Sequence, residues 1–273
     1  MRGRTRALGA GVAAALAVVA SGALGLTLVP AEGSEPEGGG QRSGGAALAS
    51  SLSGPRRVAE ASAAPVVQQM VVFRGGRTRT GRVAARQVLV QVGGKRCAVG
   101  EGTALAALVR SRPGRLRLRD FGSCSSRPRD GAGLFVSGIG PDRNRGQNGW
   151  VYKVGRRGAT AGAADPGGPF GRGRLRTGQR VTWFYCRLRD GGCQRSLELR
   201  ATAEPGGLLA TVRGYDDEGR GVPIDGANVT AGDASATTGA DGSAHLALGA
   251  GSYRPVAAKP GLVRSFPERV EVP

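Results

Sequence analysis

Short apolar runs recur along the chain from residue 66 onward, and most of them are too short to be amphipathic helices. β-Branched and aromatic residues dominate these runs, and Gly, Pro or charged residues separate them. This pattern predicts β-strands. In the first half the predicted strands lie within "VVQQMVVF" (66–73), "QVLVQVG" (87–93), "GLFVSGIGP" (133–141), "GWVYKVG" (149–155), "GRLRTGQRVTWFYCRL" (173–188) and "CQRSLELRATA" (193–203).

One segment has helical character. In "EGTALAALVRS" (101–111), Thr103 is placed as an N-cap, Leu105 and Leu108 are three residues apart, and Pro113-Gly114 follows as a stop signal. Strands combined with one helix predict an α+β domain over residues 66–196.

The last part of the chain, residues 197–273, has a different pattern. Short alternating runs are separated about every ten residues by the turn signals "EGRG", "GADG" and "GAG". This spacing is typical of a small antiparallel β-sandwich. The runs are "LLATVRGYD" (208–216), "ANVTAG" (227–232), "SAHLALG" (243–249), "SYRPVAAKPG" (252–261) and "ERVEVP" (268–273).

Two predicted strands each contain a Trp-x-Tyr pair, Trp150 with Tyr152 and Trp183 with Tyr185. Residues two apart share one face of a strand. One interpretation is that the strands pair and their rings form the domain core. The other is a ligand-binding surface made by Trp150 and Tyr152 beside the basic loop that holds Arg143 and Arg145.

The positive charge is concentrated in the middle of the chain. The protein has a formal net charge of +19, with 36 Arg against 3 Lys, so codon usage contributes to the excess. Residues 66–196 contain 26 Arg and Lys against 6 Asp and Glu, whereas residues 197–273 contain 7 against 10. Codon usage would affect every segment alike, so the basic middle indicates a surface that binds polyanions.

Two Arg-rich segments, "RPGRLRLRD" (112–120) and "GRGRLRTGQR" (171–180), alternate Arg with Leu. On a strand this alternation places the arginines on one solvated face. Such a face either keeps the domain soluble or docks carboxylates and phosphates, which arginine binds bidentately.

The N-terminus has the features of an export signal. Three arginines in "MRGRTR" precede an uncharged stretch from Ala7 to Val29. Residues 1–30 are therefore expected to be a cleaved signal peptide or an uncleaved signal anchor. The Gly/Ser/Ala/Pro-rich residues 31–65 are expected to be a disordered linker. We expect contact with a membrane only through the N-terminal segment.

The four cysteines, Cys97, Cys124, Cys186 and Cys193, are even in number and contain no C-x-x-C pair. In an exported protein this predicts two disulfides rather than a metal or redox site. Four cysteines allow three pairings. A tight turn at Arg189-Asp190 would place Cys186 opposite Cys193 and leave Cys97 with Cys124.

The sequence offers little for catalysis. His245 is the single histidine, and it lies in a predicted strand of the last segment. A serine or cysteine nucleophile would have no histidine base nearby. We expect no enzyme activity, no cofactor and no metal site.

Several motifs in residues 66–190 resemble the transcobalamin-like C-terminal domain family, a bacterial domain of unknown function. They are "EGTALAAL" (101–108), "LFVSGIG" (134–140), "GWVYKVG" (149–155) and "LRTGQRVTWFY" (175–185). Two positions depart from the family pattern, Gln179 in place of an acidic residue and "VGR" (154–156) in place of "VNG". The resemblance implies a β-grasp-like fold and, in the cobalamin carriers, one side of a corrinoid site.

The last segment resembles the carboxypeptidase-regulatory-like and prealbumin-like sandwiches of bacterial surfaces. The motifs are "GRGVPIDGANVTAG" (219–232), "TTGADGSAHLAL" (237–248) and "GSYRPVAAKPG" (251–261). The expected fold is thus mainly β: a β-grasp-like α+β domain followed by an Ig-like or prealbumin-like sandwich.

The expected function is non-catalytic binding or adhesion at the cell surface, or as a secreted protein. The basic first domain would contact an anionic cell-wall polymer or lipid headgroups, and we do not expect it to bind nucleic acid. The alternatives are a carrier of a corrinoid-like small molecule and a structural spacer.

Overall fold

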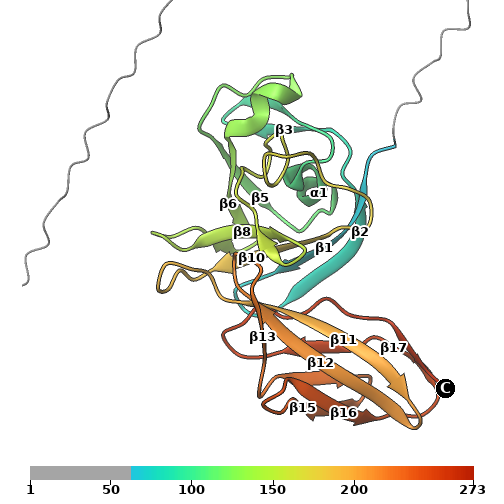
Figure 1. Ribbon diagram of the computed structural model, residues 1–273. Helices are drawn as coiled ribbons and strands as arrows, with labels where there is room; N and C mark the ends of the chain where they lie inside the picture. The colour runs from blue at the N-terminus through green and yellow to red at the C-terminus, as the bar shows by residue number, and fades with distance from the viewer. Residues whose placement is uncertain (1–62) are drawn as a thin grey trace, which may run out of the picture. The chain divides into compact units, whose positions relative to one another are not determined.

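The computed structural model describes residues 63–273, and its architecture is mainly β (Figure 1). The predicted export segment 1–30 and nearly all of the predicted linker 31–65 lie outside the described residues. Within residues 63–273, no helix is both long enough and apolar enough to cross a membrane.

The largest sheet has the strand order β2-β1-β10-β8-β9. β1 runs parallel to β10, and the other neighbouring strands are antiparallel. Its central strands are β1, β10 and β8, which correspond to three of the apolar runs in the sequence. The bounds are β1 (Val66–Val72), β2 (Thr78–Ala84), β8 (Gly149–Val154), β9 (Arg157–Gly158) and β10 (Arg180–Cys186).

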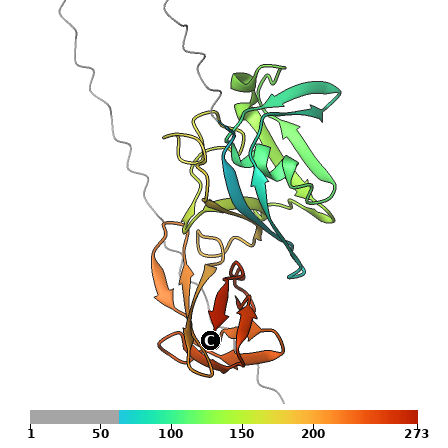
Figure 2. The same ribbon diagram turned by 90° about the vertical axis from the view of Figure 1, so that its right-hand side faces the viewer.

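The predicted helix forms as α1 (Ala104–Arg110), and Ala104 to Leu108 are all buried. The predicted N-cap is confirmed, because the Oγ1 of Thr103 accepts a hydrogen bond from the backbone N–H of Ala106 at 3.2 Å. Figure 2 shows this helix beside β1 and β2.

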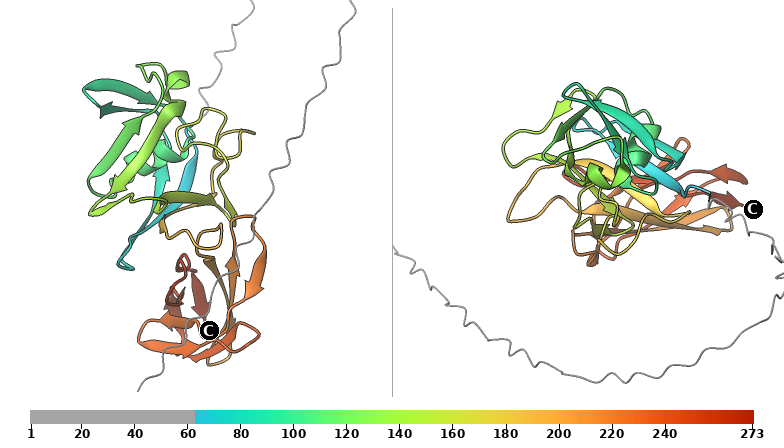
Figure 3. Two further views of the ribbon diagram at one scale, coloured as in Figure 1. Left: turned by 90° about the vertical axis from the view of Figure 1, so that its left-hand side faces the viewer. Right: turned by 90° about the horizontal axis from the view of Figure 1, so that it is seen from above.

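The remaining elements of the first half cover the other side of α1. A hairpin is made by β3 (Val88–Val92) and β4 (Lys95–Val99), and a small sheet has the order β5-β6-β7. The left view of Figure 3 shows α1 between the strands β1 and β2 and the strands β5 and β6. The bounds are β5 (Leu116–Asp120), the 3₁₀ helix η1 (Pro128–Gly133), β6 (Leu134–Ile139) and β7 (Asp142–Arg143).

In residues 196–273, strands are the only regular secondary structure. One sheet joins β11, β12 and β13, with β16 also paired to β12; a second has the order β15-β14-β18, and β17 pairs with β19. The bounds are β11 (Ser196–Glu204), β12 (Gly207–Tyr215), β13 (Gly221–Pro223), β14 (Asn228–Ala231), β15 (Ala234–Thr237), β16 (Ser243–Ala247), β17 (Gly251–Tyr253), β18 (Val256–Ala258) and β19 (Val270–Val272).

Buried apolar side chains gather in three clusters. The largest contains α1 and the aromatic face of the main sheet, and a second lies among β11 to β19. A third, small cluster packs the opposite face of the main sheet, through Met70, Val72 and Phe184, against Val263. The central strands of the main sheet are therefore covered on both faces.

Both disulfides are present, Cys97–Cys124 and Cys186–Cys193. This is the pairing that the hairpin argument favoured, and two disulfides are compatible with an extracellular protein. The predicted position of the turn, Arg189-Asp190, is wrong by one residue. Arg189 pairs with Gly192, and Asp190 and Gly191 both have positive φ, because the mirror-image two-residue turn prefers Asp-Gly at its centre.

The Arg-rich segment 171–180 does not form a strand as predicted. Only Arg180 belongs to β10, and residues 171–179 are a loop. The loop is held by Leu175, which is buried and donates its backbone N–H to the carbonyl of Gly102 at 2.8 Å. Leu175 therefore holds this loop against the residues that precede α1. The alternation of Arg with Leu in the sequence did not indicate a strand here.

Candidate functional site

The two Trp-x-Tyr strands pair with each other, as the core interpretation predicted. β8 and β10 are antiparallel, with Trp150 opposite Tyr185 and Tyr152 opposite Trp183. All four rings belong to the largest buried cluster. Tyr152 and Trp183 stack with their centroids 5.0 Å apart, whereas Trp150 and Tyr185 meet edge to face at 6.1 Å. These geometries are the preferred ones for aromatic pairs.

The polar atoms of three of these rings find partners at the edge of the core. The indole N–H of Trp150 donates to the carbonyl of Asp142, and the hydroxyl of Tyr152 donates to the carbonyl of Ala161, both at 3.0 Å. Burial raises the pKa of the Tyr152 hydroxyl, and the charge of Asp165 adds to this effect. The buried Nε1 of Trp183 has no hydrogen-bond partner among the described residues.

An apolar pocket of about 320 Å³ lies on this aromatic face, and we call it the aromatic pocket. Trp150, Tyr152 and Trp183 contribute to its lining, together with Phe121 and Phe135. Phe121 and Phe135 are exposed, at 73% and 44%, and their rings meet edge to face at 5.8 Å. The predicted aromatic residues therefore border a pocket although their own rings are mostly buried.

The structure places Arg143 and Arg145 away from that pocket. Both side chains are exposed, and neither contributes to the lining of the aromatic pocket. Their backbones shape the hairpin: the carbonyl of Arg143 accepts the hydroxyl proton of Tyr185, and Arg145 pairs with Asn148. The predicted group of two aromatics and two arginines is thus divided between two places.

Arg143 instead adds to a basic cluster on the β5-β6-β7 sheet, where the segment 112–120 contributes Arg115 and Arg117. The guanidinium of Arg117 donates to the carbonyl of Gly140 at 2.6 Å. Desolvation lowers the pKa of Arg117, and the positive charges of Arg143 and Arg115 lower it further. Like charges therefore gather on this sheet.

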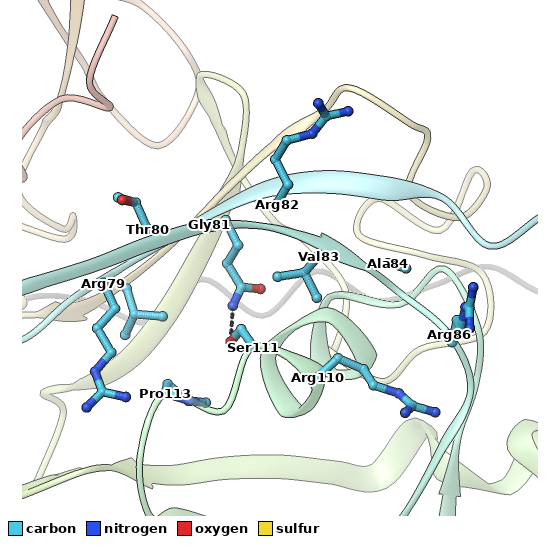
Figure 4. A pocket seen from close by; sticks show the side chains of 12 residues that line it. Arg79, Thr80, Gly81, Arg82, Val83, Ala84, Arg86, Arg110, Ser111 and Pro113 are labelled. Atoms are coloured by element: carbon cyan, nitrogen blue, oxygen red, sulfur yellow. Dashed lines mark hydrogen bonds between the residues drawn. The ribbon is translucent and has the colours of Figure 1, made fainter. Parts of the chain in front are cut away.

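A second pocket, of about 470 Å³, lies between the edge strand β2 and the end of α1, and we call it the β2–α1 pocket (Figure 4). Four arginines line it: Arg79, Arg82, Arg86 and Arg110. Figure 4 shows Arg79 at one end and Arg86 with Arg110 at the other, while Arg82 extends from the opposite side of β2.

The charge in this pocket has no acidic counterpart. No Asp or Glu lines it, and within residues 63–273 none of the four guanidinium groups forms a salt bridge. Arg79 donates to the carbonyl of Arg112 at 3.1 Å, and Arg110 donates to the carbonyl of Gln87 at 2.6 Å. These bonds hold two of the arginines in place while leaving their charge unneutralised.

The pocket exists because β2 has a glycine on the side that faces α1. Gly81 is directly opposite Gln69 of β1, and a Cβ atom added at Gly81 would meet no atom within 4 Å. On β1, Gln69 is buried and donates from Nε2 to the Oγ of Ser111 at 2.5 Å. The missing side chain leaves a hollow between Arg79 and Val83.

The reverse face of β8 holds a buried charge that the sequence reasoning did not predict. Lys153 is 1% exposed, and its ammonium donates to the carbonyls of Tyr215 and Asp216 at 3.0 and 2.8 Å. It also pairs with the carboxylate of Asp217 at 3.2 Å. The available signal was that Lys153 is the one charged residue in the apolar run "GWVYKVG" (149–155).

His245 lies on β16 and is exposed. Its Nδ1 is 3.2 Å from an oxygen of the Glu204 carboxylate, and the side chain is 73% exposed. This is a surface pair.

Sequence reasoning identified the positive charge of the first half but not the pocket that concentrates it. The segment "RTRTGRVA" (77–84) contains two Thr and one Val, which favour a strand, but its three arginines interrupt the apolar pattern, and the strand was not predicted. The pairing of β2 with β1 then brings it beside the end of α1, about 30 residues later in the chain. No local sequence pattern predicts that β2 lies beside the end of α1.

Comparison of this chain with protein-family models, with curated proteins and with solved structures found no match.

Proposed function

We propose that this protein is a non-catalytic binding protein of the cell surface or the extracellular space. Its basic first half, residues 66–196, would hold an anionic partner, with the β2–α1 pocket as the main contact. The observation that carries this proposal is the set of four arginines around one pocket that contains no acidic residue. The two disulfides support an extracellular setting.

Four unneutralised arginines around one hollow favour an anionic group. Arginine stays charged at any physiological pH and presents planar pairs of donors that match carboxylate and phosphate oxygens. Because these side chains are exposed, salt screens their charge and the affinity falls as ionic strength rises. A phosphate-containing cell-wall polymer and anionic lipid headgroups both fit these requirements.

The finer assignments of fold belong to this proposal. The parallel pairing of β1 with β10 and the helix against the main sheet support a β-grasp-like first domain, as the transcobalamin-like resemblance implies. The three small sheets around one apolar cluster support a sandwich for residues 197–273. Domains of this kind serve as display and binding modules.

The test is a matched pair of triple variants. Arg79, Arg86 and Arg110 are changed to Gln in one protein, and Arg96, Arg127 and Arg172 are changed to Gln in the other. The second three are exposed and, among the described residues, form no side-chain hydrogen bond or salt bridge. Both variants lose the same charge, so only the location differs.

Binding is measured on immobilised teichoic-type polymer and on heparin at increasing salt. The pocket variant is expected to elute at clearly lower salt than the control variant, because bidentate contacts are lost at one site. Equal shifts for both variants would mean that diffuse charge is responsible and that the pocket is not the site. Failure of the wild type to bind either polyanion would overturn the proposal.

A second candidate function is the binding of a small planar molecule in the aromatic pocket. The observation that favours it is the pair of exposed rings, Phe121 and Phe135, which line that pocket together with Trp150 and Tyr152. A corrinoid is the probe, since it quenches tryptophan fluorescence on close approach. Quenching that saturates in the wild type and weakens in Phe121→Ala supports this function, and no quenching at high corrinoid concentration excludes it for that ligand.

A further inference from the structure

The edge of β2 that faces away from β1 carries free backbone groups. The backbone N–H of Phe73 donates to the carbonyl of Arg77, and that of Ala85 donates to the carbonyl of Pro65, at 2.9 and 2.8 Å. These bonds fix the alternation of the antiparallel ladder between the two strands. The odd-numbered residues of β2 therefore point their N–H and C=O groups at β1, and the even-numbered residues point theirs outward.

The outward groups belong to Thr78, Thr80, Arg82 and Ala84. Only the carbonyl of Ala84 is engaged, by the backbone N–H of Arg86 at 2.8 Å. β2 is the terminal strand of its sheet, and no other strand within residues 63–273 pairs with it. Thr78, Thr80 and Arg82 thus present alternating donors and acceptors along an open edge.

This open edge borders the β2–α1 pocket. Consecutive backbone positions from Arg79 to Ala84 line the pocket, and α1 with Ser111 forms its other wall. Because Gly81 has no side chain, there is space beside it for a side chain of an incoming strand. Arginines lie on both faces of β2, with Arg79 on the pocket side and Arg82 on the other.

We propose that an extended acidic peptide segment of a partner protein binds by adding a strand to β2, with its carboxylates paired on the pocket side to Arg79, Arg86 and Arg110. The proposal rests on the anion-binding function proposed above and specifies the partner of that same site. Addition of a strand to an exposed sheet edge is a recurrent mode of peptide recognition, in which main-chain hydrogen bonds supply affinity and side-chain contacts supply specificity.

The edge favours a peptide over a phosphate polymer because it offers acceptors as well as donors. The phosphodiester groups of such a polymer accept hydrogen bonds but donate none to the outward carbonyls of Thr78 and Thr80, whereas a peptide backbone offers N–H and C=O groups at the spacing of the strand edge. Charged edge strands also deter pairing between identical chains. Here the same arginines repel a second copy of this basic domain and attract an acidic segment.

The test uses an eight-residue capped peptide in which Glu alternates with Val. A second peptide has the same sequence with N-methyl groups on alternate residues, so its charge is unchanged while the donors toward β2 are lost. The protein variants are Thr80→Pro, which removes one outward N–H, and Thr80→Ala, which keeps it. Proline is tolerated at an edge position whose N–H faces solvent, so the pairing of β2 with β1 is expected to persist.

Dissociation constants are measured by titration calorimetry, and amide exchange of Thr78, Thr80 and Arg82 is followed by NMR. The expected result is affinity that falls roughly tenfold or more on N-methylation and again in Thr80→Pro, with little change in Thr80→Ala. The three amides should become protected when the unmodified peptide binds. Thr80→Pro is checked by urea unfolding, and the N-methylated peptide keeps the test valid if this variant is unstable.

Equal affinity for both peptides, with no protection of the three amides, overturns strand addition while leaving the anion-binding function intact. Inorganic polyphosphate binding that is stronger than peptide binding and unaffected by Thr80→Pro would assign the pocket to phosphate polymers. If neither the peptide nor polyphosphate binds the wild type, both the strand proposal and the underlying function fail. The three results are distinguishable.

Discussion

At the residue scale, Lys153 is the one charged residue that is buried among residues 63–273. Its ammonium is enclosed by two backbone carbonyls and by the Asp217 carboxylate, and it lies 5.9 Å from the centre of the Phe184 ring. Burial lowers the pKa of Lys153, and the charge and hydrogen bond of Asp217 oppose this lowering. The charge is therefore tolerated because three oxygens surround it.

This arrangement predicts that the two ends of the pair are not equally important. Asp217→Asn leaves a buried ammonium with only neutral acceptors, and we expect it to reduce the free energy of unfolding by about 1–3 kcal/mol. Lys153→Met removes the buried charge itself and leaves unpaired an Asp217 side chain that is 33% exposed, so we expect a smaller loss. Urea unfolding of both variants measures the difference. A larger loss for Lys153→Met would show that the carbonyl contacts outweigh the ion pair.

At the element scale, α1 is the element on which both the core and the β2–α1 pocket depend. It is only seven residues long, and its first five residues are buried. Short helices are marginal by themselves, so capping and packing must supply the stability. Thr103 is 1% exposed and links the first turn of α1 to the preceding segment, since its hydroxyl also donates to the carbonyl of Gly100 at 2.7 Å.

Loss of this cap should therefore destabilise the domain. Thr103→Ala removes the acceptor for the N–H of Ala106 and leaves the carbonyl of Gly100 without its donor, so we expect a loss of about 1–2 kcal/mol. Thr103→Ser keeps the hydroxyl and is the matched control. Thermal and urea unfolding provide the measurement, and equal stability of the Ala and Ser variants would contradict the capping role.

The two disulfides constrain loops of different length. Cys97–Cys124 closes a loop with a sequence separation of 27, and Cys186–Cys193 one of 7. By chain entropy, their removal is expected to cost about 3.5 and about 2.5 kcal/mol, respectively. The comparison is between the double variants Cys97→Ala/Cys124→Ala and Cys186→Ala/Cys193→Ala in urea. A larger loss of unfolding free energy on removal of Cys186–Cys193 would show that native contacts, rather than loop length, determine how much each disulfide stabilises the fold.

At the scale of the whole molecule, the acidic residues of the last part of the chain pair with basic residues of the first part. Arg180 contacts Glu268 at 2.7 Å, and Arg156 binds Glu198 through two bonds of 2.6 and 2.7 Å. With Lys153 and Asp217, these pairs link sequence regions of opposite net charge. The arginines of the β2–α1 pocket take no part in them.

The pair of Arg156 with Glu198 gives the molecule a dependence on acidic pH. The hydrogen bond from Arg156 lowers the pKa of Glu198 below its ordinary value of 4.5. A carboxylate with a lowered folded-state pKa stabilises the fold above its ordinary pKa, and this contribution is lost as the pH falls through the lowered value.

We therefore expect the wild type to lose more unfolding free energy than Glu198→Gln as the pH falls below 4.5. Urea unfolding of both proteins from pH 7 to pH 3 measures this difference. Arg156 is 43% exposed, so screening keeps the effect small, and it should shrink further at high salt. Parallel pH profiles for the two proteins would contradict the linkage.

The sequence by itself determined the mainly β class, the helix after the Thr103 cap and the two disulfides, whereas for the Trp-x-Tyr rings it left both burial and an exposed binding surface open. These features depend on local patterns: strand periodicity, a capping residue, a short cysteine spacing and the alternation of faces. The net charge of the first half was also readable from composition. None of these inferences required knowledge of which distant segments meet.

Only the tertiary structure decided where the charge becomes a site. Gly81 leaves a hollow because it lies opposite Gln69, and α1 closes that hollow because β2 is the edge strand beside it. The same packing separated Arg143 and Arg145 from Trp150 and Tyr152 and buried Lys153 between two regions of the chain. Strand order and register arise from long-range packing, so no local pattern of residues specifies them.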